Sequence, residues 1–528
     1  MRKQFKGQAA WAWAAAALGA AVLAGCGGSD GAGRTAAMAA ASGEDAVPSL
    51  AQSLEAAAPQ LGVARVLVLQ PARIRLEGVD QALLQASAPV VGARLIGEAR
   101  HVAATDSLDG TARQWRWQPT AQGGQVAALS FAAQGAHGLR LGVLVSALPA
   151  EAVLRVYRQD LRSAVYETTG QAVLDSLARN VQADGSTLSA RVWWTPDTGG
   201  DEATLEVELP AGMPTASVQL AVPQLSHVFE DLSLPTADEW SMQTKLNESE
   251  SCQLDATCYS AYDSVSRAVA RMVYVKDGKS YLCTGTLLAD RGATRTPYFL
   301  SANHCISTQT VASSLQTHWF YRAPSCNSRT LSSSTVARTG GATLLYASDA
   351  TDTSFLRLND TPPSGTVFAG WDPNPQAVGV STVGVHHPRG DLQKISFGRI
   401  SSMAQCTTVS GTSFSCQLGS SGNYYRVAWS EGIMEGGSSG SGLFNASNSL
   451  VGTLYGGSSS CTATGGTDAY GRFDVPYQAA IKQWLSPEAT PTPTPDPTPT
   501  GTASGAQTWL SLMQRLPAIN ANQSIRLP

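Results

Sequence analysis

The position of the nine cysteines is the feature that most constrains this 528-residue chain. Cys26 stands alone near the N-terminus, whereas the other eight lie in the second half of the chain. These eight are Cys252, Cys258, Cys283, Cys305, Cys326, Cys406, Cys416 and Cys461. An even set of eight can form four disulfides in an oxidising compartment. The distribution therefore predicts an exported protein with a disulfide-bonded second half and a first half of a different kind.

An export signal precedes Cys26. Basic residues at the N-terminus are followed by an apolar run from Ala9 to Ala24 and then by small residues, which are the three parts of a signal peptide over residues 1–25. Residues 23–26, Leu-Ala-Gly-Cys, resemble a bacterial lipobox, so Cys26 is predicted to carry the lipid of a membrane-anchored lipoprotein of the cell envelope. The alternative is an ordinary signal peptide with an incidental cysteine, which would give a secreted protein.

Composition sets the other boundaries. The region between the leader and the cysteine-bearing half contains short runs typical of strands, such as residues 63–69 and 203–209. Repeated Thr-Pro pairs after the last cysteine predict a stiff, extended linker. The expected order is a flexible tether over 27–49, a separate β-rich region over 50–245, the cysteine-bearing domain over 246–486, a linker over 487–502 and a tail over 503–528.

Charge excludes one class of partner. Charged residues make up 14% of the chain and the formal net charge is −4, so no broad basic surface for nucleic acid is expected. Only the N-terminal run is apolar enough to enter a membrane, which argues against a protein with several membrane spans.

Three residues in the cysteine-bearing half suit nucleophilic catalysis. His304 follows the strand-like segment 298–300, Asp352 precedes an alternating segment, and Ser439 lies in the Gly-rich turn 436–442. A serine hydroxyl needs an adjacent base to take its proton, and that imidazole needs a carboxylate to fix its tautomer. The N–H groups of Gly437 and Ser439 are predicted to form the oxyanion hole.

Two rival chemistries fit the sequence less well. The turn also matches the Gly-x-Ser-x-Gly elbow of α/β-hydrolases, with Ser438 as nucleophile, but that fold requires a later His and all seven His lie at or before His387. His386 and His387 are adjacent rather than spaced along one helix face, which argues against a metal site. We expect both to be structural, and we expect no metal and no cofactor.

Taken together, these residues resemble the bacterial lysyl endopeptidases, a branch of the chymotrypsin-like serine proteases. The matching segments are residues 282–287, 302–305, the strand after Asp352, and residues 386–388, 437–441, 454–461 and 468–472. The resemblance covers about residues 246–486 and implies an all-β fold of two six-stranded antiparallel β-barrels with the active site between them. Residues 474–485 have the Asp cap, early Pro and spacing of the expected C-terminal helix.

The resemblance pairs the first cysteine of the domain with the last, and the second with the fifth. The third and fourth flank the strand pair before His304 and would crosslink the loop that carries it. The remaining two are close in sequence and suit a hairpin. The expected disulfides are Cys252–Cys461, Cys258–Cys326, Cys283–Cys305 and Cys406–Cys416.

Specificity is approached in the same way. Trypsin-like enzymes usually carry an Asp six residues before the nucleophile, but Ile433 occupies that position here. In the lysyl endopeptidases the acid follows the active-site turn, so Asp468 is the predicted counter-charge for a P1 Lys, with Trp429 as an aromatic beside the cleft. The alternative for Asp468 is a solvated loop position. Tyr455 stands where the family typically has a His.

Lysine usage suggests how such an enzyme matures. Lys245 is the only lysine between the signal peptide and residue 246, so cleavage after it would start a product at Leu246. We hypothesise a zymogen whose pro-region is removed by self-cleavage and acts as an inhibitor or folding template. The predicted function is an exported, monomeric serine endopeptidase acting on proteins or peptides. The alternative is a catalytically silent, membrane-anchored binding lipoprotein that keeps the pro-region as a permanent binding domain.

Overall fold

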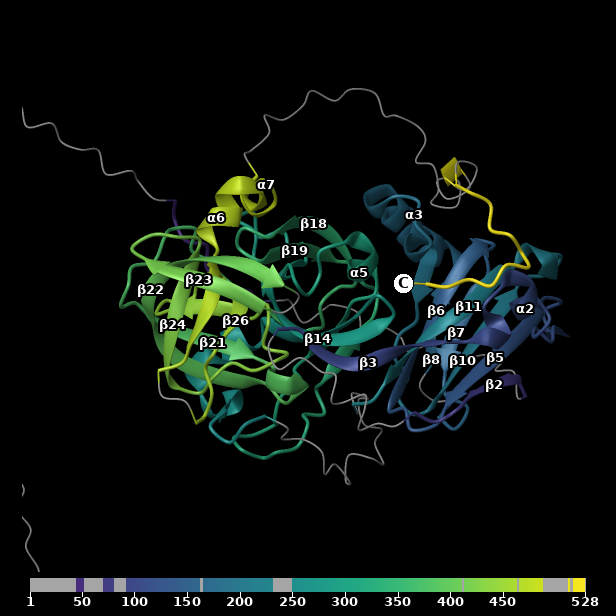
Figure 1. Cartoon of the computed structure of the whole chain (residues 1–528), viewed down its shortest axis with the longest axis horizontal. Helices are drawn as coiled ribbons and strands as arrows, with labels where there is room; N and C mark the ends of the chain where they lie inside the picture. The colour runs from purple at the N-terminus through teal and green to yellow at the C-terminus, as the bar shows by residue number, and fades with distance from the viewer. Residues whose placement is uncertain are drawn as a thin grey trace, which may run out of the picture. The chain divides into compact units, whose positions relative to one another are not determined.

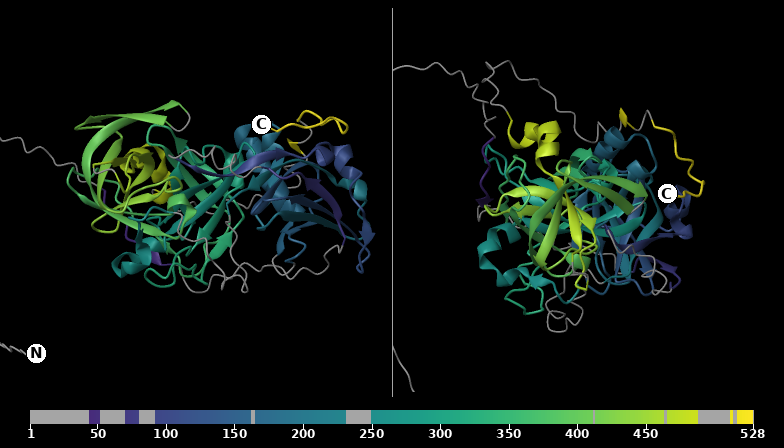
Figure 2. Two further views of the ribbon diagram at one scale, coloured as in Figure 1. Left: turned by 60° about the horizontal axis from the view of Figure 1, so that its bottom comes forward. Right: turned by 60° about the vertical axis from the view of Figure 1, so that its left-hand side comes forward.

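The structure is a computed structural model that describes residues 44–51, 70–79, 92–161, 165–230, 249–410, 413–462, 465–487, 511–512 and 516–527 (Figures 1 and 2). Residues from Glu44 onward belong to one compact unit. The predicted signal peptide with Cys26, the strand expected at 63–69, Lys245 with Leu246, and most of the Thr-Pro linker lie outside the described residues. Among the helices that are described, none is long and apolar enough to span a membrane.

The N-terminal half, up to residue 245, is β-rich as expected. The run predicted at 203–209 is part of β10, and the strands of two sheets share one hydrophobic core with helix α3 (Gly170–Asp184). The first sheet contains β2 (Ala72–Leu76), β4 (Gln118–Pro119), β5 (Gln125–Ala133), β7 (Val153–Tyr157), β8 (Val165–Thr169) and β10 (Glu202–Leu209). The second contains β3 (Arg94–His101), β6 (Gly138–Ala147), β9 (Val192–Trp194) and β11 (Gln219–Val228), and α2 (Leu108–Ala112) packs beside β11 (Figure 1).

The C-terminal half, residues 246–486, begins with an open half-barrel. Its strands pair in the order β17, β16, β13, β14, β15, β19, β18, and no pairing among the described residues closes the two ends. The first of the two expected six-stranded barrels is therefore incomplete. The elements are β13 (Val269–Lys276), β14 (Lys279–Leu288), β15 (Tyr298–Ala302), α5 (Gln309–Ser313), β16 (Gln316–Trp319), β17 (Val336–Arg338), β18 (Ala342–Ser348) and β19 (Thr353–Leu358).

The second barrel is closed. Six strands pair in the order β22, β21, β25, β26, β27, β24, and the β22–β24 pairing joins the two ends of this order. β12 (Leu254–Asp255) and β23 (Ser413–Gly419) also pair with β22. The six are β21 (Ser381–His386), β22 (Lys394–Ser410), β24 (Tyr424–Glu431), β25 (Gly442–Asn445), β26 (Leu450–Gly457) and β27 (Thr467–Arg472). The helix expected over 474–485 is present as α6 (Asp474–Pro476), the π-helical turn η8 (Tyr477–Ile481) and α7 (Lys482–Leu485).

Four disulfides crosslink the C-terminal half, and they have the pairing that was expected. They are Cys252–Cys461, Cys258–Cys326, Cys283–Cys305 and Cys406–Cys416. The first closes the longest loop, with a sequence separation of 209, and ties the start of this half to the segment after β26. The last clasps the β22–β23 hairpin, where the two cysteines are direct cross-strand partners.

A strand pairing joins the two halves. β3 of the N-terminal half pairs antiparallel with β14 of the half-barrel, so a single 11-stranded sheet of the described chain runs from one half into the other (Figure 1). Two short segments at the ends of the described chain also cross between the halves. β1 (Leu50–Ala51) pairs with β20 (Val367–Phe368) of the C-terminal half, and Ile525 of the tail packs in a core cluster of the N-terminal half.

Candidate active site

Two hydrogen bonds join the residues predicted as base and acid. His304 lies just beyond β15, and Asp352 immediately precedes β19, which is the neighbour of β15 in the sheet. The backbone N–H of His304 donates to Asp352 Oδ1 at 2.9 Å, and His304 Nδ1 lies 2.6 Å from Oδ2. The carboxylate therefore favours the tautomer with the proton on Nδ1. His304 Nε2 is buried and has no hydrogen-bond partner within the described chain, so it is available to accept a proton.

The turn that carries the predicted nucleophile packs against the end of β15. Ser439 is only 2% exposed, and its carbonyl accepts the Thr284 N–H at 2.8 Å. The Thr284 hydroxyl donates to the Gly437 carbonyl at 2.9 Å, so one β14 residue fixes both sides of the turn. A Cβ on Gly440 would lie 2.2 Å from Ser301 Oγ, and the φ of Gly440 is +82°. Glycine is thus required for Ser439 to approach the strand that ends before His304.

Sequence reasoning missed what His386 does for this turn. His386 was expected to be structural, and its Nδ1 lies 2.8 Å from the hydroxyl of Ser438, the residue before Ser439. Its Nε2 lies 3.2 Å from Ser396 Oγ, and burial lowers the pKa of His386 to about 3, so the ring is neutral. The paired His386 and His387 were the available signal, but nothing in the local pattern indicates which serine either ring contacts.

One of the two N–H groups predicted to form the oxyanion hole donates a hydrogen bond to a carbonyl oxygen of the N-terminal half. The N–H of Gly437 donates to the carbonyl oxygen of Gly92 at 3.2 Å. Gly92 shortly precedes β3, whose Arg94 is the strand partner of Leu282. Leu282 is next to Cys283, which is bonded to Cys305 beside His304. The edge of the N-terminal half therefore lies along the strand that borders the predicted catalytic residues.

Asp468 is a buried carboxylate held by neutral donors. It lies on β27 and is 1% exposed, which removes the alternative of a solvated loop position. Trp429 Nε1 donates to Asp468 Oδ2 at 2.6 Å, and the Ser459 hydroxyl donates to the same oxygen at 2.5 Å. Burial raises the pKa of Asp468, and the hydrogen bonds from Ser459 and Trp429 only partly offset it. Such a site gains from an added cation.

An aromatic stack stands beside His304. The Tyr455 ring centroid lies 6.0 Å from that of His304 and 4.2 Å from that of Phe414, and Tyr424 adds a third ring. The Tyr455 hydroxyl lies 2.6 Å from Thr408 Oγ1. The residue that stands where the family typically has a His therefore forms part of the wall next to the imidazole.

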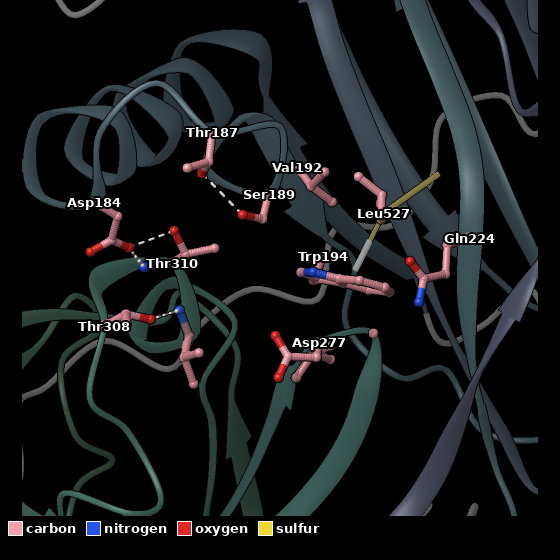
Figure 3. Close-up of a pocket in the computed structure, with 13 residues that line it drawn as sticks. Asp184, Thr187, Ser189, Val192, Trp194, Gln224, Asp277, Thr308, Thr310 and Leu527 are labelled. Carbon is pink, nitrogen blue, oxygen red and sulfur yellow. Dashed lines mark hydrogen bonds between the residues drawn. The ribbon is translucent and has the colours of Figure 1, made fainter. Parts of the chain in front are cut away.

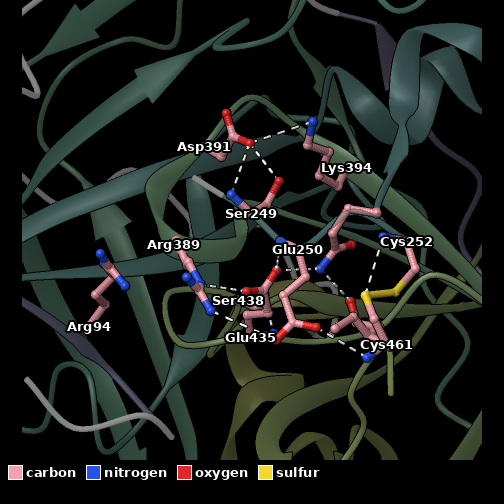
Figure 4. A network of polar contacts seen from close by, with 12 residues as sticks. Arg94, Ser249, Glu250, Cys252, Arg389, Asp391, Lys394, Glu435, Ser438 and Cys461 are labelled. Atoms are coloured by element: carbon pink, nitrogen blue, oxygen red, sulfur yellow. Dashed lines mark hydrogen bonds and ion pairs between the residues drawn. A yellow bond between two sulfur atoms is a disulfide. The ribbon is translucent and has the colours of Figure 1, made fainter. Parts of the chain in front are cut away.

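The start of the C-terminal half is fastened close to the nucleophile turn (Figure 4). Glu435 lies four residues before Ser439, and its carboxylate accepts the Glu250 N–H at 3.1 Å and pairs with Arg389 at 2.6 Å. Cys461 N–H donates to the Glu250 carboxylate at 3.2 Å. Figure 4 shows Arg94 of the N-terminal half on the side of Arg389 in the same view. The segment that follows the predicted processing site thus supports the turn directly.

One group of potential metal ligands lies in this region, formed by Cys283, His304 and Cys305. The two sulfur atoms are bonded to each other. They are therefore not thiolates and do not offer a metal the usual cysteine ligand.

Comparison with known proteins found matches for both halves of the chain. The sequence profile of the lysyl endopeptidase C-terminal domain matches residues 246–471, and that of the lysyl endopeptidase N-terminal domain matches residues 69–229. The chain is 33% identical over 377 residues to a lysyl endopeptidase of Pseudomonas aeruginosa, covering 68% of this chain and 74% of the relative.

Two solved protease structures are among those that match part of the chain. The MamO protease domain of Magnetospirillum magneticum is 13% identical, with a TM-score of 0.29, over 41% of this chain and 98% of its own. The active form of the Rv3671c protease of M. tuberculosis is 12% identical, with a TM-score of 0.30, over 46% of this chain and 90% of its own. By the two profile matches and the Pseudomonas relative, the chain belongs to the lysyl endopeptidase family and is a serine endopeptidase acting on peptide or protein substrates.

Proposed function

We propose that the chain is an exported endopeptidase that cleaves after Lys, with Ser439 as nucleophile, His304 as general base and Asp352 as the residue that orients the imidazole. The observation that carries this proposal is the geometry of the pair: Asp352 holds both the backbone N–H and Nδ1 of His304. Nε2 is left without a partner in the described chain, on a loop against which the Ser439 turn packs.

The mechanism follows from these positions. His304 Nε2 takes the hydroxyl proton of Ser439 as Oγ bonds to the scissile carbonyl carbon, and the carbonyl oxygen becomes anionic. The N–H groups of Gly437 and Ser439 donate to that oxygen. The C–N bond then breaks, and His304 gives its proton to the leaving amine. Water, deprotonated by the same ring, attacks the acyl-enzyme and releases the acid, and the proton returns to Ser439.

Preference for Lys is proposed from the environment of Asp468. Its carboxylate is buried among the neutral donors Trp429 and Ser459, and no salt bridge to it is found in the described chain. The ammonium of a P1 Lys would supply the missing positive charge and return the raised pKa of Asp468 towards its ordinary range. The name of the Pseudomonas relative supports the same preference.

The N-terminal half is proposed to be an inhibitory pro-region that the enzyme separates from the C-terminal half by cleaving the chain after Lys245. In support, the Gly92 carbonyl takes up the N–H of Gly437, which the substrate oxyanion needs, and β3 adds to the edge of β14 beside Cys283. A substrate cannot use that donor while Gly92 occupies it. The processing site itself rests on the sequence, where Lys245 is the only lysine between the leader and Leu246.

Export and anchoring are proposed from the sequence as well. The leader over residues 1–25 and the eight cysteines of the C-terminal half suit an oxidising compartment outside the cytoplasm. Cys26 is proposed to be lipidated, which would hold the unprocessed chain at a membrane of the cell envelope. We further propose a monomer that uses no cofactor and does not bind nucleic acid, in line with the net charge of −4.

The test compares the wild-type chain with Ser439→Ala by intact mass and N-terminal sequencing. Wild type is expected to convert to a product that starts at Leu246, whereas Ser439→Ala stays long. Ser447→Ala, at an exposed serine of the neighbouring β25–β26 turn, is the matched control and should process normally. If wild type and Ser439→Ala both stay long and an organophosphorus reagent labels neither, the silent binding lipoprotein becomes the better interpretation.

A digest of an unrelated denatured protein then tests the Lys preference. Cleavage is expected after Lys and not after Arg, because the proposal pairs Asp468 with the compact ammonium of Lys rather than with the longer, planar guanidinium of Arg. Equal cleavage after both residues would remove the Lys assignment and leave the serine endopeptidase in place.

A further inference from the structure

We propose that the two halves stay bound to each other after cleavage at Lys245, because each fragment carries a terminal segment that is docked on the other. We name residues 44–51 the N-terminal strap and residues 516–527 the C-terminal strap. The first lies upstream of the cut but packs on the C-terminal half. The second lies downstream of the cut but packs on the N-terminal half. This inference rests on the proposed self-processing.

The N-terminal strap is attached to the C-terminal half by backbone pairing and by charge. Val47 is 5% exposed and exchanges two backbone hydrogen bonds with Trp371, at 2.8 and 3.0 Å. The strap continues as β1, which pairs with β20. At its start, the Glu44 carboxylate accepts the Tyr477 hydroxyl at 2.6 Å and pairs with Lys482. The hydrogen bonds from Lys482 and Tyr477 lower the pKa of Glu44, so the carboxylate is charged at neutral pH.

The C-terminal strap is attached to the N-terminal half in a similar way. Ile525 is 4% exposed and shares a hydrophobic cluster with residues of α2, β6, β9 and β11. Its N–H donates to the Asp106 carbonyl at 2.8 Å, and the Asp109 N–H donates to the Ala521 carbonyl at 3.0 Å. Further up the strap, Arg191 Nη1 donates to the Pro517 carbonyl at 3.1 Å. The contact is therefore specific in register as well as apolar.

The end of the C-terminal strap reaches the boundary between the halves (Figure 3). Leu527 lines a cavity of about 240 Å³, together with Asp184 and Trp194 of the N-terminal half and Asp277 and Thr310 of the C-terminal half. Across the same boundary, the Asp184 carboxylate accepts the Thr310 N–H and hydroxyl, each at 2.6 Å. The C-terminal strap thus ends at the boundary between the two halves, where residues of both halves already contact each other directly.

Cleavage after Lys245 would leave both straps in place. Residues 44–51 would remain covalently joined to the N-terminal half while lying on the C-terminal half, and the reverse holds for residues 516–527. Two tethered contacts raise the local concentration of each fragment for the other, so loss of one contact is followed by rebinding rather than escape. The Gly92 carbonyl would stay near Gly437 for the same reason, so the active site would become free in those molecules from which the N-terminal half has dissociated.

The experiment uses the full chain carrying Ser439→Ala, cut by a trace of wild-type enzyme. Separation of the fragments is followed by size-exclusion chromatography at nanomolar concentration and by the dissociation rate of a labelled N-terminal fragment. We expect the cut chain to elute as one complex. Val47→Asp and Ile525→Asp should each speed dissociation by about tenfold, and a chain ending at Thr502 with Val47→Asp by about a hundredfold or more.

Matched controls separate strap contacts from general effects. Ala46→Asp and Arg526→Asp place the same side chain at neighbouring positions that are exposed, and both should dissociate like the unmodified complex. A further variant carries a site for an unrelated protease within residues 490–500. Cutting there leaves the strap on the N-terminal half but removes its link to the C-terminal half, and it should release the fragment as truncation does.

Three results would overturn the inference. They are equal dissociation rates in all variants, retention after the linker cut when truncation releases the fragment, and elution at twice the expected mass. The second would mean that the strap only stabilises the N-terminal half, and the third that straps are exchanged between copies. If wild-type enzyme does not cut at Lys245, self-processing fails but retention is still measured, with an unrelated protease site placed over residues 236–243.

Discussion

Each half of the molecule buries a carboxylate, but only one of the two forms an ion pair within the described chain. In the N-terminal half, Glu206 is fully buried and lies 3.0 Å from the guanidinium of Arg155. Burial opposes the charge of Arg155, but the hydrogen bonds that it donates to Glu208, Glu167 and Glu206 outweigh this effect and raise the pKa of Arg155. In the C-terminal half, Asp468 has only neutral donors, and burial raises its pKa.

The difference distinguishes a carboxylate with a structural role, Glu206, from one that can bind an added cation, Asp468. The charge on Glu206 is satisfied within the sheet formed by β7 and β10, so nothing needs to be added. Asp468 carries the cost of burial without an ion pair, since Arg426 acts on it only at longer range and does not outweigh that cost. A cation that contacts the carboxylate would recover more of it. A buried acid without an ion pair is the kind of group that the proposed Lys preference requires.

Removing Arg155 should have the largest effect, because Glu206 would then be left without its ion pair. Arg155→Met, in the Ser439→Ala background, is expected to lower the free energy of unfolding of the N-terminal half by about 3–5 kcal/mol. Urea unfolding with hydrogen exchange over β7 and β10 measures it. Arg158→Met is the control, since Asp160 in its ion pair is 68% exposed, and it should cost under about 1 kcal/mol. Equal losses would remove the distinction.

Neutralising Asp468 tests whether its carboxylate binds the ammonium of a P1 Lys. Asp468→Asn is expected to lower kcat/KM for substrates with P1 Lys by roughly 10²- to 10³-fold, because the ammonium would then be buried without its counter-charge. Substrates with a neutral P1 residue should change little. Asp277→Asn, at an exposed carboxylate on the β13–β14 turn, provides the matched control and should behave like wild type. An equal loss for charged and neutral substrates would instead indicate damage to the fold.

The pH dependence of kcat/KM should also depend on the charge of Asp468. Because the pKa of Asp468 is raised above the usual carboxyl value, the carboxyl becomes neutral at a higher pH than an exposed Asp. Below that pKa, kcat/KM for P1 Lys should fall by about tenfold per pH unit relative to a neutral P1 substrate. Taking the ratio of the two substrates cancels any group, His304 included, that acts on both. A ratio independent of pH would contradict the assignment.

The smallest change is expected at Trp429. Its N–H donates to Asp468 and lowers the pKa of that carboxyl against the effect of burial. Trp429→Phe removes the donor, so the fall of kcat/KM for P1 Lys at low pH should begin at a pH about one unit higher. Trp484→Phe, on helix α7, is the comparison variant and should leave the pH of this fall unchanged. A fall that begins at lower pH in Trp429→Phe would mean that the indole does not act through this hydrogen bond.

Local patterns were enough to predict much of the site. His304 and Asp352 were placed at the ends of two strand-like segments, and those segments are β15 and β19, neighbours in one sheet. The Gly-rich turn around Ser439 was recognisable because its glycines are needed for close approach, as Gly440 shows. These features depend on residues near each other in sequence, or on motifs that the family shares.

Long-range pairings could not be predicted in this way. The Gly92 carbonyl on the Gly437 N–H joins residues from opposite halves, and no periodicity in either segment indicates the contact. The pairing of β3 with β14 depends on edge strands that both have free hydrogen-bonding groups, which a sequence pattern does not reveal. The tail residue Ile525 has only a few apolar neighbours in sequence, and its burial is decided by a groove built from four other elements.

The N-terminal and C-terminal straps also set the order in which contacts between the halves can form during synthesis. Ser49 contacts Gly370, which lies 321 residues downstream, so the N-terminal strap has no docking place until most of the C-terminal half has been made. Ile525 lies further downstream than Gly370, and its contact with the N-terminal half comes later still. Both straps can therefore be docked only after residue 525 has been synthesised.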